Sequence, residues 1–191
     1  MSRKRTVLLE AAANLIEAAG GSMPITTLNK ALFYLDIFAL RDFGEPITGT
    51  AYIALPAGPV VARYDKRLVA ALEDEGIAQQ DISEESGGKP ICLLKRPSPE
   101  TLDSERLALV RRIGQWASTK TAKELSDLSH QNDGWRIAWD EGLGARLPAR
   151  SVNLRIAMQQ IIDIDPWVDE APKGDVATAF SEAESEEGEA F

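Results

Sequence analysis

LNKALFYLDIFALRDFG, residues 28–44, and the EPITGTAYIALPAGPVVARY that follows it, residues 45–64, decide the fold of this chain. The first stretch is apolar almost all the way round a helix, which is typical of a helix at the centre of a core. The second predicts a short extended hairpin, a corner at 56–59 and a new helix over 60–75. Both prolines of the corner fix φ and lack an N–H, and Gly58 tolerates backbone angles closed to other residues. We therefore expect a rigid corner that aims the next helix in one direction.

Helical periodicity around this stretch predicts a mainly α fold, a compact helical domain with one or two short β-hairpins. A helix followed by a hairpin is the layout of a winged helix. N-caps are expected at Thr26, Thr121 and Ser151, with Glu124 completing a capping box. The expected helices are 6–19, 26–43, 60–75, 104–116, 121–131 and 152–163, and the strands of the second hairpin are 77–82 and 90–94.

Acidic residues are concentrated near the C-terminal end. The chain of 191 residues carries a formal net charge of −9, and residues 163–191 hold ten acids and a single lysine. Residues 1–162 are therefore formally neutral, with twenty acids and twenty bases. A stretch rich in Glu, Ala and Ser with few large apolar groups cannot offset the entropy of ordering. We predict a helical domain over 1–162 and a flexible acidic tail over 163–191.

Cysteine content and apolar runs indicate a cytoplasmic protein that does not enter a membrane. Cys92 is the only cysteine, so no intrachain disulfide is possible and a reducing compartment is favoured. The basic residues at 3–5 followed by an apolar run resemble a secretory signal. Glu10, Asn14 and Glu17 interrupt that run at helical spacing, which predicts an amphipathic helix instead. No segment is long and apolar enough for a membrane span.

Four sequence blocks occur in order along the chain: KALFYLD, PITG, LPAGPV with the tyrosine after it, and ELSDLSH with a later tryptophan. Together they resemble the Panacea domain of the SocA-like antitoxin family over roughly residues 5–140. The resemblance implies a mostly helical protein that neutralises a protein toxin encoded beside it by direct contact. In some members it implies an adaptor that delivers the toxin to an AAA+ protease. The candidate partner-binding or motif residues of the four blocks are Lys30, Tyr34, Asp36, Pro56, Gly58, Pro59, Tyr64, Ser126, His130 and Trp135.

Two features depart from the pattern of that family. Ala57 stands where an aromatic residue is common in the proline corner, and QNDG, residues 131–134, separates His130 from Trp135. The alanine leaves the expected backbone conformation of the corner unchanged but removes an aromatic side chain as a contact group. It therefore bears on which partner the protein prefers.

The motif residues also have structural interpretations. Lys30 and Asp36 are six residues apart, so they do not face one another as i, i+4 partners would. Because unpaired burial of a charge costs several kcal/mol, structural pairing with other groups is favoured over direct toxin contact. Tyr34 is best interpreted as a core anchor whose hydroxyl needs a partner. The prolines of the corner are most simply a scaffold.

Catalysis and metal binding are not expected. Ser126 and His130 share a helix face at i, i+4 spacing and so imitate a nucleophile with its base. A regular helix does not present a serine to substrate and an oxyanion hole together, so a structural hydrogen bond is favoured for the histidine. One histidine and one cysteine cannot form a typical zinc site. We therefore expect no enzyme and no cofactor.

A DNA-binding autoregulator is the alternative function. The winged-helix layout supports it, as do the basic residues at 3–5 and the pair Arg111-Arg112, which could meet phosphates. The neutral domain and the acidic tail oppose it, because phosphate neutralisation by Lys and Arg supplies much of the affinity for DNA. The tail has three open interpretations: an unfolded handle for a protease, a competitor for the basic groove of a toxin, or a solubilising extension.

Overall fold

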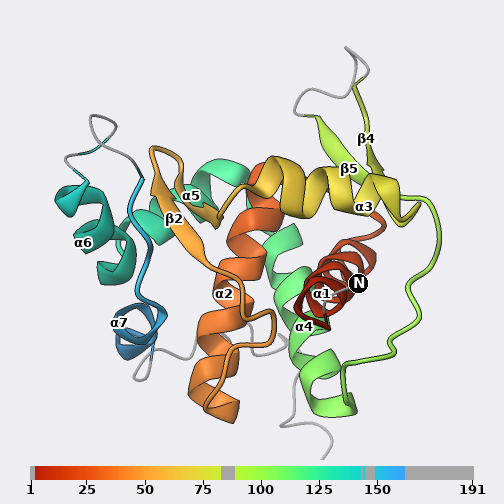
Figure 1. The fold of residues 1–191 in the computed structure, drawn as a ribbon, viewed down its shortest axis with the longest axis horizontal. Helices are drawn as coiled ribbons and strands as arrows, with labels where there is room; N and C mark the ends of the chain where they lie inside the picture. Colours follow the sequence, from red (N-terminus) through yellow and green to blue (C-terminus); the bar gives the residue numbers. More distant parts are fainter. Residues whose placement is uncertain (1–2, 83–88, 143, 145–148, 162–191) are drawn as a thin grey trace, which may run out of the picture.

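A computed structural model describes residues 3–82, 89–142, 144 and 149–161, and within these ranges the protein is mainly helical. Figure 1 shows its helices grouped around α2, with two small antiparallel sheets at their edges. A π-helical segment, η1, runs directly into α3. The helices are α1 (Arg3–Ala18), α2 (Ile25–Phe43), η1 (Asp65–Val69), α3 (Ala70–Asp74), α4 (Ser104–Ser118), α5 (Ala122–His130), α6 (Asp133–Glu141) and α7 (Leu154–Gln159).

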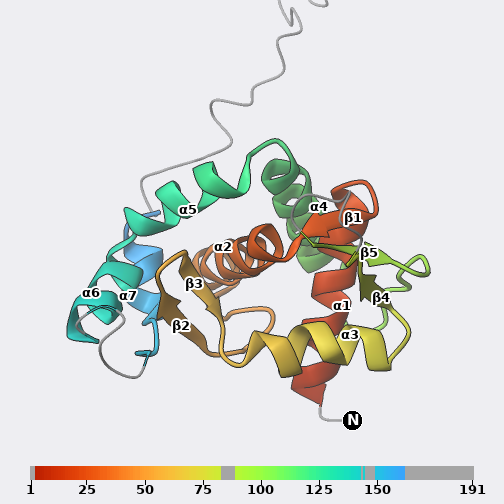
Figure 2. The same cartoon turned by 90° about the horizontal axis from the view of Figure 1, so that it is seen from above.

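Helix α2 is the centre of the core, as its sequence predicts. Every residue from Thr27 to Leu40 is buried, and α2 packs against α1, α4, α5, α7 and β3. In the view from above, the other helices and both sheets surround it (Figure 2). A helix that buries its whole circumference needs partners on every side, and this requirement sets the arrangement of the other elements.

The first sheet has the order β1-β5-β4 and is antiparallel throughout. Its strands are β1 (Ser22–Pro24), β4 (Ala78–Gln80) and β5 (Pro90–Leu93). Cα partners are Met23 with Ile91 and Gln79 with Cys92. The pairing of β4 with β5 confirms the predicted second hairpin, whose connection over 83–88 lies outside the described residues. The addition of β1 joins the end of α1 to this hairpin.

The second sheet corrects the expectation for the proline corner. Strands β2 (Tyr52–Leu55) and β3 (Gly58–Val61) pair antiparallel, with Leu55 opposite Gly58. The corner is therefore the turn of a hairpin, and the helix expected over 60–75 begins at Asp65 instead. Val60 and Val61 are β-branched and extend the ladder, while Arg63, at φ 60°, redirects the chain into the helix.

A later segment lies along the outer edge of β2. Ser151 forms an isolated bridge with Ile53. The amide of Ala54 donates to the carbonyl of Arg150 at 3.0 Å, and the amide of Val152 donates to the carbonyl of Tyr52 at 2.8 Å. Residues 150–152 thus act as a third strand of the hairpin sheet.

Capping chemistry is confirmed at one of the three predicted sites. Thr121 and Glu124 form the reciprocal capping box of α5. No side chain caps α2, which starts directly after Pro24, so the N-cap expected at Thr26 is wrong. The N-cap of α7 is Asn153, because the predicted cap at Ser151 takes part in the bridge to β2.

Helix α6 was not predicted from the sequence. The predicted tail, 163–191, lies outside the described residues.

Candidate functional site

The tip of the β2–β3 hairpin is held by side chains from three helices. The carbonyl of Leu55 accepts from Nε1 of Trp135 on α6 at 3.1 Å. The carbonyl of Ala57 accepts from Oγ of Ser126 on α5 at 3.0 Å, and that of Pro59 accepts from Nζ of Lys30 on α2 at 3.0 Å. Every second carbonyl of the turn is therefore fixed by a different helix. We call Leu55–Pro59 the hairpin tip, and Lys30, Ser126 and Trp135 its clamp.

Lys30 is the deepest member of the clamp. Its side chain is completely buried within α2, and this burial lowers the pKa of its amine to about 8. Among the described residues no carboxylate forms an ion pair with it, so the carbonyl of Pro59 is its hydrogen-bond partner. Lys30 thus serves as a structural anchor of the tip and does not reach the surface.

Gly58 is the point where the hairpin comes closest to the helices. Its φ of +101° is in the region that side chains rarely adopt. A Cβ at this position would lie 2.3 Å from Oγ of Ser129 and 2.7 Å from Cε of Lys30. Both the backbone angle and the contact distance therefore require glycine here.

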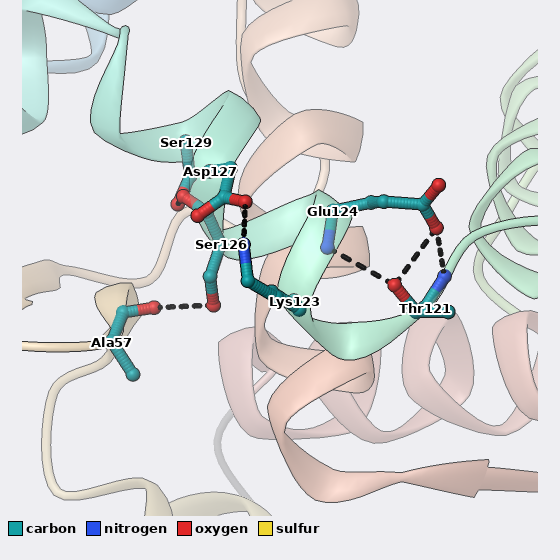
Figure 3. A network of polar contacts seen from close by, with 7 residues as sticks. All are labelled: Ala57, Thr121, Lys123, Glu124, Ser126, Asp127 and Ser129. Carbon is teal, nitrogen blue, oxygen red and sulfur yellow. Dashed lines mark hydrogen bonds and ion pairs between the residues drawn. The ribbon is translucent and has the colours of Figure 1, made fainter.

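Helix α5 fixes the tip through Ser126 (Figure 3). Ser126 donates to the tip, while the buried Ser129 donates to the carbonyl of Ser126 at 2.8 Å. Lys123 and Asp127, on the exposed side of the same helix, form an ion pair at 2.6 Å. One face of α5 thus holds the hairpin and the other presents a neutralised pair of charges to solvent.

His130 and Trp135 extend the clamp into a stack of rings. The imidazole stacks on Trp135 with centroids 4.2 Å apart, and Trp135 stacks on Trp139 at 5.4 Å. The hydroxyl of Ser126 donates to a backbone carbonyl, so it is not paired with His130 as a nucleophile with its base would be. The serine and histidine of the ELSDLSH block therefore both support the position of the hairpin.

Asp36 and Tyr34 lie elsewhere on α2. The Asp36 carboxylate accepts from the amide of Thr48 at 2.8 Å, from its hydroxyl, and from the Tyr52 hydroxyl at 2.8 Å. Burial raises the pKa of Asp36 to about 6, although these hydrogen bonds oppose the shift. The Tyr52 hydroxyl is also 2.8 Å from the carbonyl of Leu32. This arrangement fastens the 45–52 segment to α2 at the base of the hairpin.

The Tyr34 ring is buried and packs edge-on against Phe33 and Trp116, with centroids 5.4 and 5.0 Å away. Burial also raises the pKa of its hydroxyl far above the ordinary range. Tyr64, which follows β3, is half-buried against the core. Both tyrosines therefore act in packing.

The structure brings seven of the ten sequence candidates together at the tip and around it and places Tyr34, Asp36 and Tyr64 elsewhere. The seven are Lys30, Pro56, Gly58, Pro59, Ser126, His130 and Trp135. Residues that sequence reasoning missed are Asn29, whose Oδ1 accepts from the amide of Val61 at 2.9 Å, and the Thr48–Tyr52 pair on Asp36. Asn29 directly precedes Lys30, and this pair of polar residues in an otherwise apolar helix is the sequence signal that indicates it. The backbone carbonyls that the clamp residues bind carry no sequence signal, because every residue has one.

A hollow of about 420 Å³ lies elsewhere, between α1, the end of α3 and the loop at 95–100. Its lining includes the carboxyl of Glu10, which is buried. That carboxyl accepts from the amides of Glu100, Thr101 and Leu102 and from the Thr101 hydroxyl. Glu10 thus anchors the loop to α1, and its hydrogen-bonding capacity is used in doing so.

The described residues lack two features that would indicate other classes of protein. They contain no cluster of three or more His, Cys, Asp or Glu side chains placed to hold a metal ion. Within the same ranges, no helix combines the length and the hydropathy that crossing a bilayer would demand.

The fold and the clamp define a small helical protein that presents a rigidly held hairpin. The family model described as "Antitoxin SocA-like, Panacea domain" matches residues 28–136. This range covers more than half of the chain and includes all three clamp residues and the whole hairpin. The chain therefore belongs to the SocA-like, Panacea-domain antitoxin family. Comparisons with curated proteins and with solved structures gave no match.

Proposed function

We propose that this protein is an antitoxin that neutralises a cognate protein toxin by direct binding in the cytoplasm, without catalysis or a cofactor. Membership of the antitoxin family is the observation that carries the proposal. The clamp supports it, because a surface loop that is fixed in advance loses less conformational entropy when a partner binds.

We propose the hairpin side as the contact surface. Pro56 and Ala57 at the tip are exposed, and so are Lys123 and Asp127 on the neighbouring helix α5. The motif residues Lys30 and Gly58 are buried and act by fixing the tip. In this proposal the buried residues affect the surface contact through the position of the tip.

Neutralisation by this surface has two modes. The antitoxin either covers the active surface of the toxin, or it acts as an adaptor that presents the bound toxin to an AAA+ protease. For the second mode we propose residues 163–191 as the segment that the protease engages. Their acidic composition, with few large apolar groups, is typical of such a handle. Removing residues 166–191 and following the half-life of the toxin in cells separates the modes. If the antitoxin only covers the toxin, this deletion should leave the half-life of the toxin unchanged. If the antitoxin delivers the toxin to a protease, the deletion should lengthen that half-life.

Co-expression with the neighbouring gene tests the proposal as a whole. We expect the neighbour alone to arrest growth and this chain to restore it, with the two proteins co-purifying. The Ala108→Asp variant, altered at an exposed residue of α4, is a matched control that should restore growth equally well. A neighbour that is harmless alone, or that stays toxic beside this chain, contradicts an antitoxin role.

The second candidate is a DNA-binding autoregulator. Its support is the element order α1-β1-α2-α3-β4-β5 together with the sheet order β1-β5-β4, which we interpret as a winged-helix-like layout interrupted by β2 and β3. The η1–α3 helix exposes Lys66 and Arg67 but also Glu73, Asp74 and Glu75, and the acids weaken the attraction to phosphate. A shift assay on the promoter at 50 and 200 mM salt tests it, since phosphate contacts predict a steep loss of affinity with salt.

A further inference from the structure

We infer that Ala57 is the residue that selects the partner, and that the partner surface it enters is an apolar recess of a protein. This inference rests on the proposed function and deepens it. It follows from the structure of the hairpin tip, in which the clamp holds the backbone while side chains of the turn face solvent.

The backbone at position 57 is fixed independently of the side chain. The Ala57 carbonyl is held at 3.0 Å by Ser126, and its neighbours on either side are held by Trp135 and Lys30. A two-residue hairpin turn forms without such help, whereas burying a lysine that has no ion pair opposes folding. Because the clamp exceeds what the turn itself requires, its benefit lies in the position of the exposed tip.

The side chains at the tip are small and apolar. Pro56 and Ala57 are both exposed, and the proline ring restricts its own φ, so the shape of the tip is constant. A substitution at 57 changes the surface while leaving every bond of the clamp in place. The other positions of the turn lack this freedom: Gly58 admits no side chain, Pro59 is buried, and a replacement of the exposed Pro56 would also release the φ that its ring fixes.

The charges beside the tip indicate the chemistry of the partner. Lys123 is paired with Asp127 at 2.6 Å, so the exposed face of α5 next to the tip offers no net positive charge. A nucleic acid backbone would need such a charge. A rigid apolar tip beside a neutral ion pair fits a recess in a protein surface, where the methyl group of Ala57 is desolvated and the paired charges lie at the rim.

The experiment measures the affinity of the product of the neighbouring gene for Ala57→Asp, Ala57→Phe and the matched control Ala108→Asp. Calorimetry should show at least a tenfold loss for both Ala57 variants and a change within twofold for the control. Melting temperatures of all three should stay close to that of the unaltered protein, because neither position supports the core. A merely structural role for Ala57 predicts the opposite pattern, with lower melting temperatures and an unchanged affinity.

A second variant keeps the test decisive if a tip substitution prevents folding. Ala57→Cys in a Cys92→Ser background is folded first and then alkylated with a bulky maleimide. Alkylation should abolish binding, while alkylation of Ala108→Cys in the same background should not. Binding of the unaltered protein together with tight binding of the alkylated Ala57→Cys protein overturns this inference and leaves the proposed function standing. Failure of the unaltered protein to bind contradicts both.

Discussion

The α1–α4 side of the molecule and the hairpin side are held together by different forces. Helices α1 and α4 meet through small and apolar residues, and a Cβ on Gly114 would lie 2.7 Å from the backbone oxygen of Leu15. The hairpin is held by directional hydrogen bonds from Lys30, Ser126 and Trp135. Close packing of this kind gives stability. Hydrogen bonds of fixed geometry give the tip its position.

The Gly114→Val variant should produce the largest effect, because it forces the backbones of α1 and α4 apart. Overpacking against a helix backbone that cannot move aside is expected to cost about 3 kcal/mol of unfolding free energy. Urea unfolding followed by circular dichroism measures this loss. Gln115→Ala, at an exposed neighbour in the same helix, is the control and should change stability by less than ~0.5 kcal/mol. A Gly114→Val protein of normal stability would mean that the two helices are not packed as closely as described.

The Gly58→Ala variant should act on both stability and binding. The methyl group meets Ser129 and Lys30, and the residue must keep a positive φ, so we expect a loss of about 2 kcal/mol. Unlike Gly114→Val, it should also weaken toxin binding in the fraction that remains folded, because the tip moves. Calorimetry on the folded protein measures this. If binding by the folded fraction is unchanged, the position of the tip does not matter for recognition.

The Lys30→Met variant should change how stability depends on pH. The pKa of Lys30 is lowered from 10.5 to about 8 by burial, so between these values the unfolded chain binds more protons than the folded one. Stability therefore rises with pH across this window, by up to roughly 3 kcal/mol from this group. The variant should lack that rise. The difference between the two urea-unfolding curves from pH 7.5 to 10.5 measures it, and parallel curves would contradict a buried, charged Lys30.

The Thr121→Ala variant should have the smallest effect. It removes the capping box of α5, the helix that holds Ala57 through Ser126, and such a change costs about 1 kcal/mol. Hydrogen exchange should show faster opening of α5 with little change in α1 and α4. Equal acceleration in all three helices would indicate that the two sides of the molecule unfold as one unit.

The sequence predicts the parts of this fold that depend on neighbours along the chain. The central helix follows from the apolar residues around α2, and the capping box follows from the spacing of Thr121 and Glu124. The proline corner was misassigned because prolines and glycine mark a turn without indicating which strands it joins. The clamp could not be predicted, since it joins Lys30 to Pro59 and Trp135 to Leu55, pairs that are far apart in sequence and use backbone acceptors.

The strand-like segment at 150–152 has a mechanical consequence for a chain that is pulled from its C-terminal end. It lies along β2, bonded through Arg150 and Val152, and the chain passes from it through α7 towards the C-terminal end. A motor that pulls on that end loads this edge of the sheet as soon as α7 gives way. Peeling it off would uncover the polar groups of β2 and loosen the hairpin before the α1–α4 packing is disturbed. Mechanical extraction from the C-terminal end would therefore release a bound partner early, while much of the helical body is still intact.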